Sequence, residues 1–160
     1  MQPAFFKIGI VVVDLDQAMR DLGAWLGVSW TSVQEAPLRL RTTSGIEDVA
    51  LRFVYSTGEP PYFELLEAQP RGYYAAPNGP FLHHYGRWVD DLAKASSELA
   101  ARGLPLEAAG VDEAGRSPSL FAFHAGPHAT RVELVDSGNR KNFEAWLAGG
   151  ELVLGGASAS

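Results

Sequence analysis

The chain has 160 residues, which suits one domain or two small modules that share a core. It carries 13 basic and 19 acidic side chains, and the net charge of −6 argues against nonspecific binding to nucleic acid. Cysteine is absent, so disulfide scaffolds, thiolate zinc sites and cysteine nucleophiles are excluded. We expect no signal peptide in residues 1–7 and no membrane-spanning stretch, and therefore a cytoplasmic protein without membrane partners.

The first half of the chain predicts a strand, a helix and three further strands. Residues 5–13 are apolar and rich in β-branched side chains, which indicates a strand buried on both faces. Asp14 is a suitable N-cap for a helix that Gly27 would end. The remaining strands of this half are predicted over 38–42, 49–55 and 62–67.

The same order of elements begins again after residues 68–80, a segment rich in proline and glycine that predicts a linker. Lys-Ile-Gly-Ile-Val-Val-Val-Asp-Leu at 7–15 matches His-Tyr-Gly-Arg-Trp-Val-Asp-Asp-Leu at 84–92. Tyr-Phe-Glu-Leu-Leu-Glu at 62–67 matches Arg-Val-Glu-Leu-Val-Asp at 131–136. Because both ends of the unit recur in the same order, the sequence predicts two tandem βαβββ modules.

The repeat also sets the expected boundaries. The first module should span residues 1–67, and the second should span 81–136 after the linker at 68–80. Residues 137–160 are expected to form a C-terminal helix, over 140–148, followed by a flexible tail.

Alternation of side chains along a strand predicts which residues share a face. The apolar side of the first strand should pack on its helix, so Lys7 faces away, and by the repeat His84 does the same while His83 points to the opposite side. Glu64 and Glu133 occupy matching positions on the last strands. A glutamate inside an apolar strand is costly to bury unless it is paired or metal-bound. If the modules pair about a pseudo-two-fold axis, two acids, an imidazole and an ammonium group converge on one concave surface.

These matched segments, over about residues 5–136, resemble the vicinal oxygen chelate superfamily, which includes glyoxalase I, methylmalonyl-CoA epimerase, extradiol dioxygenases and bleomycin-resistance proteins. The resemblance implies an α+β fold in which the two tandem βαβββ modules form an open, cup-shaped mixed β-sheet with helices outside. It also implies a divalent metal (Zn, Ni, Co, Mn or Fe) held by the start of each first strand and by a glutamate on each last strand. In this family such cups form within one chain or across a homodimer.

Carried over to this chain, the resemblance implies Glu64, His84 and Glu133 as metal ligands, with either glutamate as the catalytic base. Lys7 stands where metal-binding members usually have histidine, and a protonated lysine nitrogen cannot coordinate a metal. Two alternatives remain open. The metal is held by three protein ligands and water, or Lys7 and a protonated His84 balance the two glutamates without a metal.

Six side chains are expected to contact a small-molecule ligand: Lys7, Tyr55, Tyr62, Trp88, His124 and Arg131. The aromatic members suit a flat or acyl-bearing ligand. The favoured function is a metal-assisted lyase or isomerase/epimerase that acts on a small carbonyl or acyl substrate. The alternative is a metal-free protein that sequesters an aromatic or hydrophobic molecule, as bleomycin-resistance members do. An extradiol-type dioxygenase ranks third, because it would need His124 as a substitute ligand.

Overall fold

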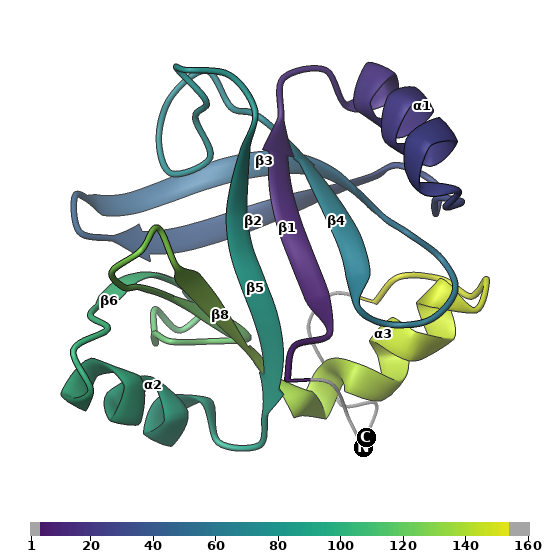
Figure 1. The fold of residues 1–160 in the computed structure, drawn as a ribbon. Helices are drawn as coiled ribbons and strands as arrows, with labels where there is room; N and C mark the ends of the chain where they lie inside the picture. Colours follow the sequence, from purple (N-terminus) through teal and green to yellow (C-terminus); the bar gives the residue numbers. More distant parts are fainter. Residues whose placement is uncertain (1–3, 154–160) are drawn as a thin grey trace.

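Two βαβββ modules follow one another in the structure, a computed structural model that describes residues 4–153 (Figure 1). The first comprises β1 (Lys7–Val12), α1 (Leu15–Leu26), β2 (Gln34–Thr42), β3 (Gly45–Tyr55) and β4 (Tyr62–Glu67). The second comprises β5 (Phe81–Val89), α2 (Leu92–Ala101), β6 (Leu106–Gly110), β7 (Phe121–Ala125) and β8 (Arg131–Asp136). A 3-10 turn, η1 (Ser137–Asn139), leads into α3 (Arg140–Leu147). The expected C-terminal tail lies, from residue 154 on, outside the described residues.

The same capping chemistry starts the helix of each module. The side chain of Asp14 accepts a hydrogen bond from the backbone N–H of Gln17 at 2.8 Å, and Asp91 does the same for Lys94 at 2.9 Å. Gly27 ends α1 in the left-handed region, with φ of 67°, which glycine adopts without steric cost. The aspartate that follows each first strand therefore turns the chain into a helix.

The strands form a ring in the order β1-β4-β3-β2-β6-β7-β8-β5. Within each module the first and last strands are parallel neighbours, β1 with β4 and β5 with β8. Antiparallel pairing of β1 with β5 and of β2 with β6 joins the modules on both sides. The α+β class and the paired modules are confirmed, and the cup expected to be open is closed into a barrel by these two junctions.

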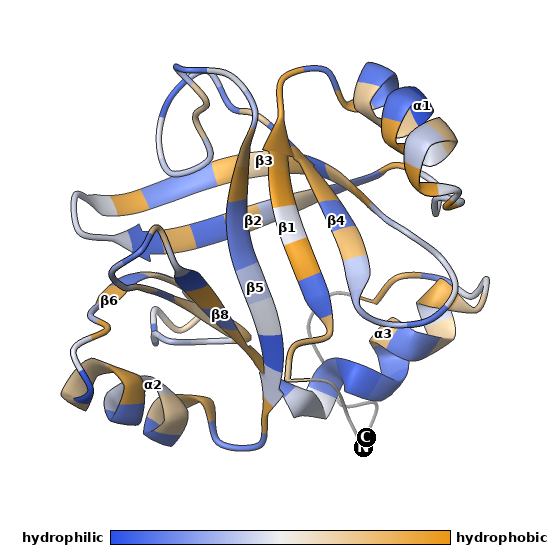
Figure 2. Cartoon of the chain, in the orientation of Figure 1, coloured by the Kyte–Doolittle hydropathy of each residue, from blue (hydrophilic) through white to orange (hydrophobic). Residues whose placement is uncertain are grey.

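The two faces of the sheet have different contents. On the outside, α1 packs on Val54 and Leu65, and α2 packs on Ala122 and Leu134. The interior holds an aromatic cluster to which α3 contributes two side chains: Phe6, Phe53, Tyr55, Phe123, Phe143 and Trp146. In Figure 2, β1 has the hydrophilic colour at its start and mostly the hydrophobic colour beyond it, and the first residue of this strand is Lys7. No helix within residues 4–153 is long and apolar enough to cross a membrane.

Candidate active site

The pairing of β1 with β5 builds a polar centre around two glycines. Gly9 lies between Glu64 on β4 and His84 on β5, in register with both. The repeat-related Gly86 lies in the same way between Lys7 on β1 and Glu133 on β8. Each row of three therefore holds an acid and a base on either side of a residue with no side chain.

The glycines are required because the flanking side chains lie directly over them. A Cβ atom on Gly86 would lie 2.5 Å from Cγ and 2.6 Å from Cε of Lys7. A Cβ atom on Gly9 would overlap the imidazole of His84. Each module thus supplies the space into which the other module's basic side chain folds.

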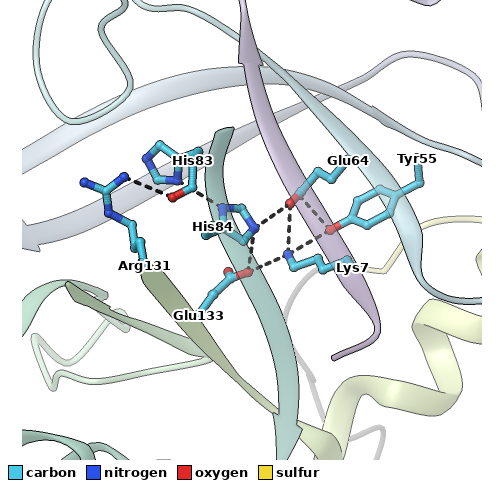
Figure 3. A network of polar contacts seen from close by, with 7 residues as sticks. All are labelled: Lys7, Tyr55, Glu64, His83, His84, Arg131 and Glu133. Atoms are coloured by element: carbon cyan, nitrogen blue, oxygen red, sulfur yellow. Dashed lines mark hydrogen bonds and ion pairs between the residues drawn. The ribbon is translucent and has the colours of Figure 1, made fainter. Parts of the chain in front are cut away.

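The four side chains meet in one buried network (Figure 3). Lys7 Nζ lies 3.0 Å from Glu64 Oε2 and 2.7 Å from Glu133 Oε2. It also donates a hydrogen bond to Tyr55 Oη at 2.9 Å, and Tyr55 Oη donates to Glu64 Oε1 at 2.6 Å. His84 Nε2 lies 3.0 and 3.1 Å from the same two carboxylate oxygens that Lys7 contacts. The predicted convergence of these side chains is therefore present in the structure, and all of them are at most 6% exposed.

Opposite charges outweigh burial in this network. Burial disfavours the charged form of every member. It raises the pKa values of Glu64 and Glu133, but the ammonium of Lys7 and the imidazole of His84 leave both below their usual range. Burial likewise lowers the pKa values of Lys7 and His84, but the carboxylates leave both raised. These directions favour a cluster of two negative and two positive charges.

A β-bulge places a second histidine beside the network. Gly9 pairs with His84 but Ile10 pairs with Leu82, so His83 is the extra, unpaired residue of β5. Both histidine rings contact Phe123, with centroids 5.4 and 5.2 Å away. The expectation that His83 points to the opposite side is wrong, because the bulge breaks the alternation. Two consecutive histidines in an apolar strand were the sequence signal that could have indicated this bulge.

His83 faces His84 through its ring nitrogens, with 3.0 Å between the two Nδ1 atoms. Burial, with the positive charge of His84, lowers the pKa of His83 to about 2, so His83 is neutral. Its Nδ1 then accepts a hydrogen bond from a protonated His84 Nδ1, which leaves His84 Nε2–H directed at the carboxylates. His83 thus holds the imidazolium of His84 in one orientation.

The polar centre forms the floor of a cavity of about 260 Å³ whose walls are otherwise mostly apolar. Phe143 and Trp146 of α3 pack against Tyr55, with ring centroids 5.0 and 5.5 Å away. Both side chains also line the cavity, so α3 covers one of its sides. The sequence predicted this helix but not its position against the site.

Five of the residues expected in the site line the cavity: Lys7, Tyr55, Glu64, His84 and Glu133. Three others lie behind its walls. Trp88 stacks on Phe6 at 4.1 Å, and Tyr62 packs edge-on against Phe143 at 6.0 Å. Arg131 binds Glu107 through two nitrogens and donates to the backbone oxygen of His83 at 3.0 Å.

His124 does not lie in the cavity, which corrects its expected place as a ligand contact. The ring is fully buried, with Nε2 2.9 Å from Ser96 Oγ on α2 and Nδ1 2.8 Å from the backbone oxygen of Leu104. Both nitrogens are therefore satisfied by the protein. The side chain faces α2 because alternation along β7 sends Phe123 inward and its neighbour outward.

Three buried donor atoms are of the kinds that divalent metals prefer. Glu64 Oε2, His84 Nε2 and Glu133 Oε2 lie within 4.8 Å of one another. Despite their ionic contacts, none has a hydrogen bond of good geometry within the described part of the chain. Their type and spacing fit a three-ligand centre. Lys7 does not fit it, because a protonated nitrogen without a lone pair already contacts both carboxylate oxygens.

Comparisons with solved structures support the fold. A methylmalonyl-CoA epimerase in complex with methylmalonyl-CoA and NH4+ has a TM-score of 0.56 at 19% identity, over 82% of this chain and 92% of that one. The methylmalonyl-CoA epimerase from Mycobacterium tuberculosis has a TM-score of 0.53 at 18% identity, over 85% and 92%. A Streptomyces coelicolor methylmalonyl-CoA epimerase variant in complex with 2-nitronate-propionyl-CoA has a TM-score of 0.57 at 18% identity, over 85% and 95%. At these identities the likeness shows the fold alone.

No curated protein matches the sequence. Residues 6–123 match the family model described as Glyoxalase/Bleomycin resistance protein/Dioxygenase superfamily. This match covers most of the chain and agrees with the fold and with the paired modules. The protein therefore belongs to the Glyoxalase/Bleomycin resistance protein/Dioxygenase superfamily, which confirms the resemblance drawn from the repeated motifs.

Proposed function

We propose that the protein is an enzyme of the isomerase or lyase type that moves a proton next to the carbonyl group of a small, mainly apolar substrate. The observation that carries this proposal is the convergence of two carboxylates and two cationic groups on the floor of an apolar cavity. Acids and bases held in contact inside a water-poor site are the groups that proton transfer at carbon requires.

Glu133 is the better placed base. Its Oε2 contacts Lys7 and His84, whereas its Oε1 has no hydrogen-bond donor among the residues that the structure describes (Figure 3). Glu64 has no such free oxygen, because Oε1 accepts from Tyr55 and Oε2 contacts Lys7. Glu133 Oε1 is thus available to a substrate in the cavity.

In the proposed step, Glu133 Oε1 takes the proton from the carbon next to the carbonyl. The electron pair of the C–H bond forms a carbon–carbon double bond, and the π pair of the carbonyl moves to its oxygen. The Lys7 ammonium lies against the same carboxylates, and its positive charge would stabilise that developing oxyanion. Return of a proton to the opposite face of the same carbon, or to a neighbouring carbon, gives an isomer. No oxidant or reductant is needed.

The size of the cavity limits the substrate. Sites for drug-sized ligands have volumes of about 300–1,000 Å³, and this cavity has about 260 Å³. It therefore suits a small molecule or the acyl end of a larger one. The methylmalonyl-CoA of one structural relative combines such an acyl group with a much larger carrier.

Two other functions keep specific support. The aromatic walls and the cover that α3 provides favour a binding protein that sequesters a hydrophobic molecule. The donor set of Glu64, His84 and Glu133 favours a metal-assisted form of the same reaction, in which a divalent ion would act as the Lewis acid. That form requires Lys7 to leave both carboxylates.

Hydrogen exchange at carbon tests the proposal directly. The protein is incubated in D₂O with 2-phenylpropanal and with S-ethyl 2-phenylpropanethioate, and loss of the α-proton signal is followed by ¹H NMR. We expect exchange above the buffer rate in the wild type and at least about 100-fold slower exchange in Glu133→Gln. Asp48→Asn, which removes a surface carboxylate, is the control. Tight binding of a probe without any exchange would favour sequestration, and exchange unchanged in Glu133→Gln would refute the assigned base.

A further inference from the structure

We propose that the Lys7 ammonium is the permanent cation of this site and takes the place of a divalent metal. The proposal rests on the proposed function only for what the cation does to a substrate. Its structural basis is that one protonated nitrogen contacts two of the three donor atoms that a metal would need.

Oxygen atoms surround the Lys7 ammonium. An ammonium group has three N–H bonds, and three oxygen atoms lie within 3.0 Å of Nζ, on Glu64, Glu133 and Tyr55. A carboxylate oxygen binds a metal at about 2.0–2.2 Å, so an ion would need the same oxygens at closer range than Lys7. The two cations therefore compete for one pair of carboxylates.

The fold also holds Lys7 in place. Its aliphatic chain lies over Gly86, where the cross-strand neighbour has no side chain. The rings of Phe6 and Tyr55 lie 5.7 and 5.5 Å from Nζ, which adds cation–π attraction. Lys7 is only 5% exposed, and its ammonium already contacts both buried carboxylates.

Charge counting agrees with this geometry. Two glutamates, Lys7 and a protonated His84 sum to zero. A divalent ion held by the two glutamates and a neutral His84 would leave a buried charge of +1 while Lys7 stays protonated, which is disfavoured without a further anion. A neutral nitrogen donor at position 7 would remove both the competition and the excess charge.

Cobalt binding tests this inference without any activity measurement. Metal-stripped wild type and Lys7→His are titrated with CoCl₂, followed by visible absorption and by calorimetry. We expect one equivalent to bind Lys7→His on the order of 100-fold more tightly than wild type, with that binding lost in Lys7→His/Glu133→Gln. Lys94→His, which adds the same imidazole to an exposed position of α2, should behave as wild type.

The possible results distinguish a failure of this proposal from a failure of the proposed function. Tight one-to-one Co²⁺ binding by the wild type, lost in Glu133→Gln, would overturn the proposal, as would a folded Lys7→His that binds no better than wild type. If Lys7→His does not fold, the wild-type titration alone decides. Absence of proton exchange with any probe would remove the proposed function and leave this cobalt result unaffected.

Discussion

Replacing Lys7 by methionine measures how strongly the fold depends on an internal cation. Methionine retains much of the aliphatic chain that lies over Gly86 but carries no charge, so Glu64 and Glu133 keep only His84 as a cationic partner. Removing one partner from a buried ion pair costs about 3–5 kcal/mol, because the remaining charge is left uncompensated. For a domain of this size that loss lowers Tm by roughly 6–20 °C.

A second substitution tests whether charge is the cause. Glu133→Gln in the Lys7→Met background restores neutrality, so we expect the double variant to be about 1–3 kcal/mol more stable than additivity predicts. Urea unfolding followed by tryptophan fluorescence gives the four free energies of the cycle. Arg39→Met removes an exposed ion pair with Asp48 and should leave the midpoint unchanged. Lys7→Met as stable as wild type, or a double variant with no such gain, would refute the electrostatic reasoning.

Three further predictions concern the two glycines of the polar centre, the titration of His84 and the cover that α3 provides. Gly86→Ala should displace Lys7, and Gly9→Ala should displace His84, so each variant should have a lower Tm. Only Gly86→Ala should bind Co²⁺ more tightly. Equal Co²⁺ affinities in the two variants would contradict the positions assigned to Lys7 and His84. The pKa of His84 is raised, so its stabilising contribution is complete below its ordinary pKa of 6.5 and is lost as pH rises through the raised value. Urea unfolding from pH 6 upward should show that loss in wild type, and a His84→Gln variant with the same slope would argue against it. Trp146→Ala should cost about 3–5 kcal/mol and increase binding of a fluorescent hydrophobic dye, whereas unchanged dye binding would mean that α3 does not cover the cavity.

The positions of Lys7, Glu64, His84 and Glu133 could be predicted because duplication and strand alternation are local properties of the sequence. Each pair occupies the same place in its module, and alternation sends each member to the face opposite the helix. No knowledge of the strand order around the barrel was needed. A polar side chain that recurs in an apolar strand is therefore a dependable guide to the interior.

The features that were missed depend on contacts between distant segments. The inward direction of His83 results from the bulge where β5 pairs with β1. The burial of His124 results from the partner that Ser96 provides, 28 positions earlier on α2. The position of α3 results from the aromatic surface that Phe6, just before β1, and Tyr55 of β3 present together. Strand periodicity carries no information on any of these pairings.

The two glycine-centred rows, one with His84 and one with Lys7, differ in their ability to release a proton. Glu64 with His84 and Glu133 with Lys7 form equivalent acid–base pairs across Gly9 and Gly86. Lysine stays protonated over the whole range in which the imidazole of His84 titrates, because its ordinary pKa lies about four units higher. The Lys7 row is therefore a fixed ion pair, and the His84 row is the one that loses a proton first as pH rises. A proton taken up by Glu133 therefore returns to the substrate, or passes to His84 once that imidazole is neutral, because Lys7 cannot accept it.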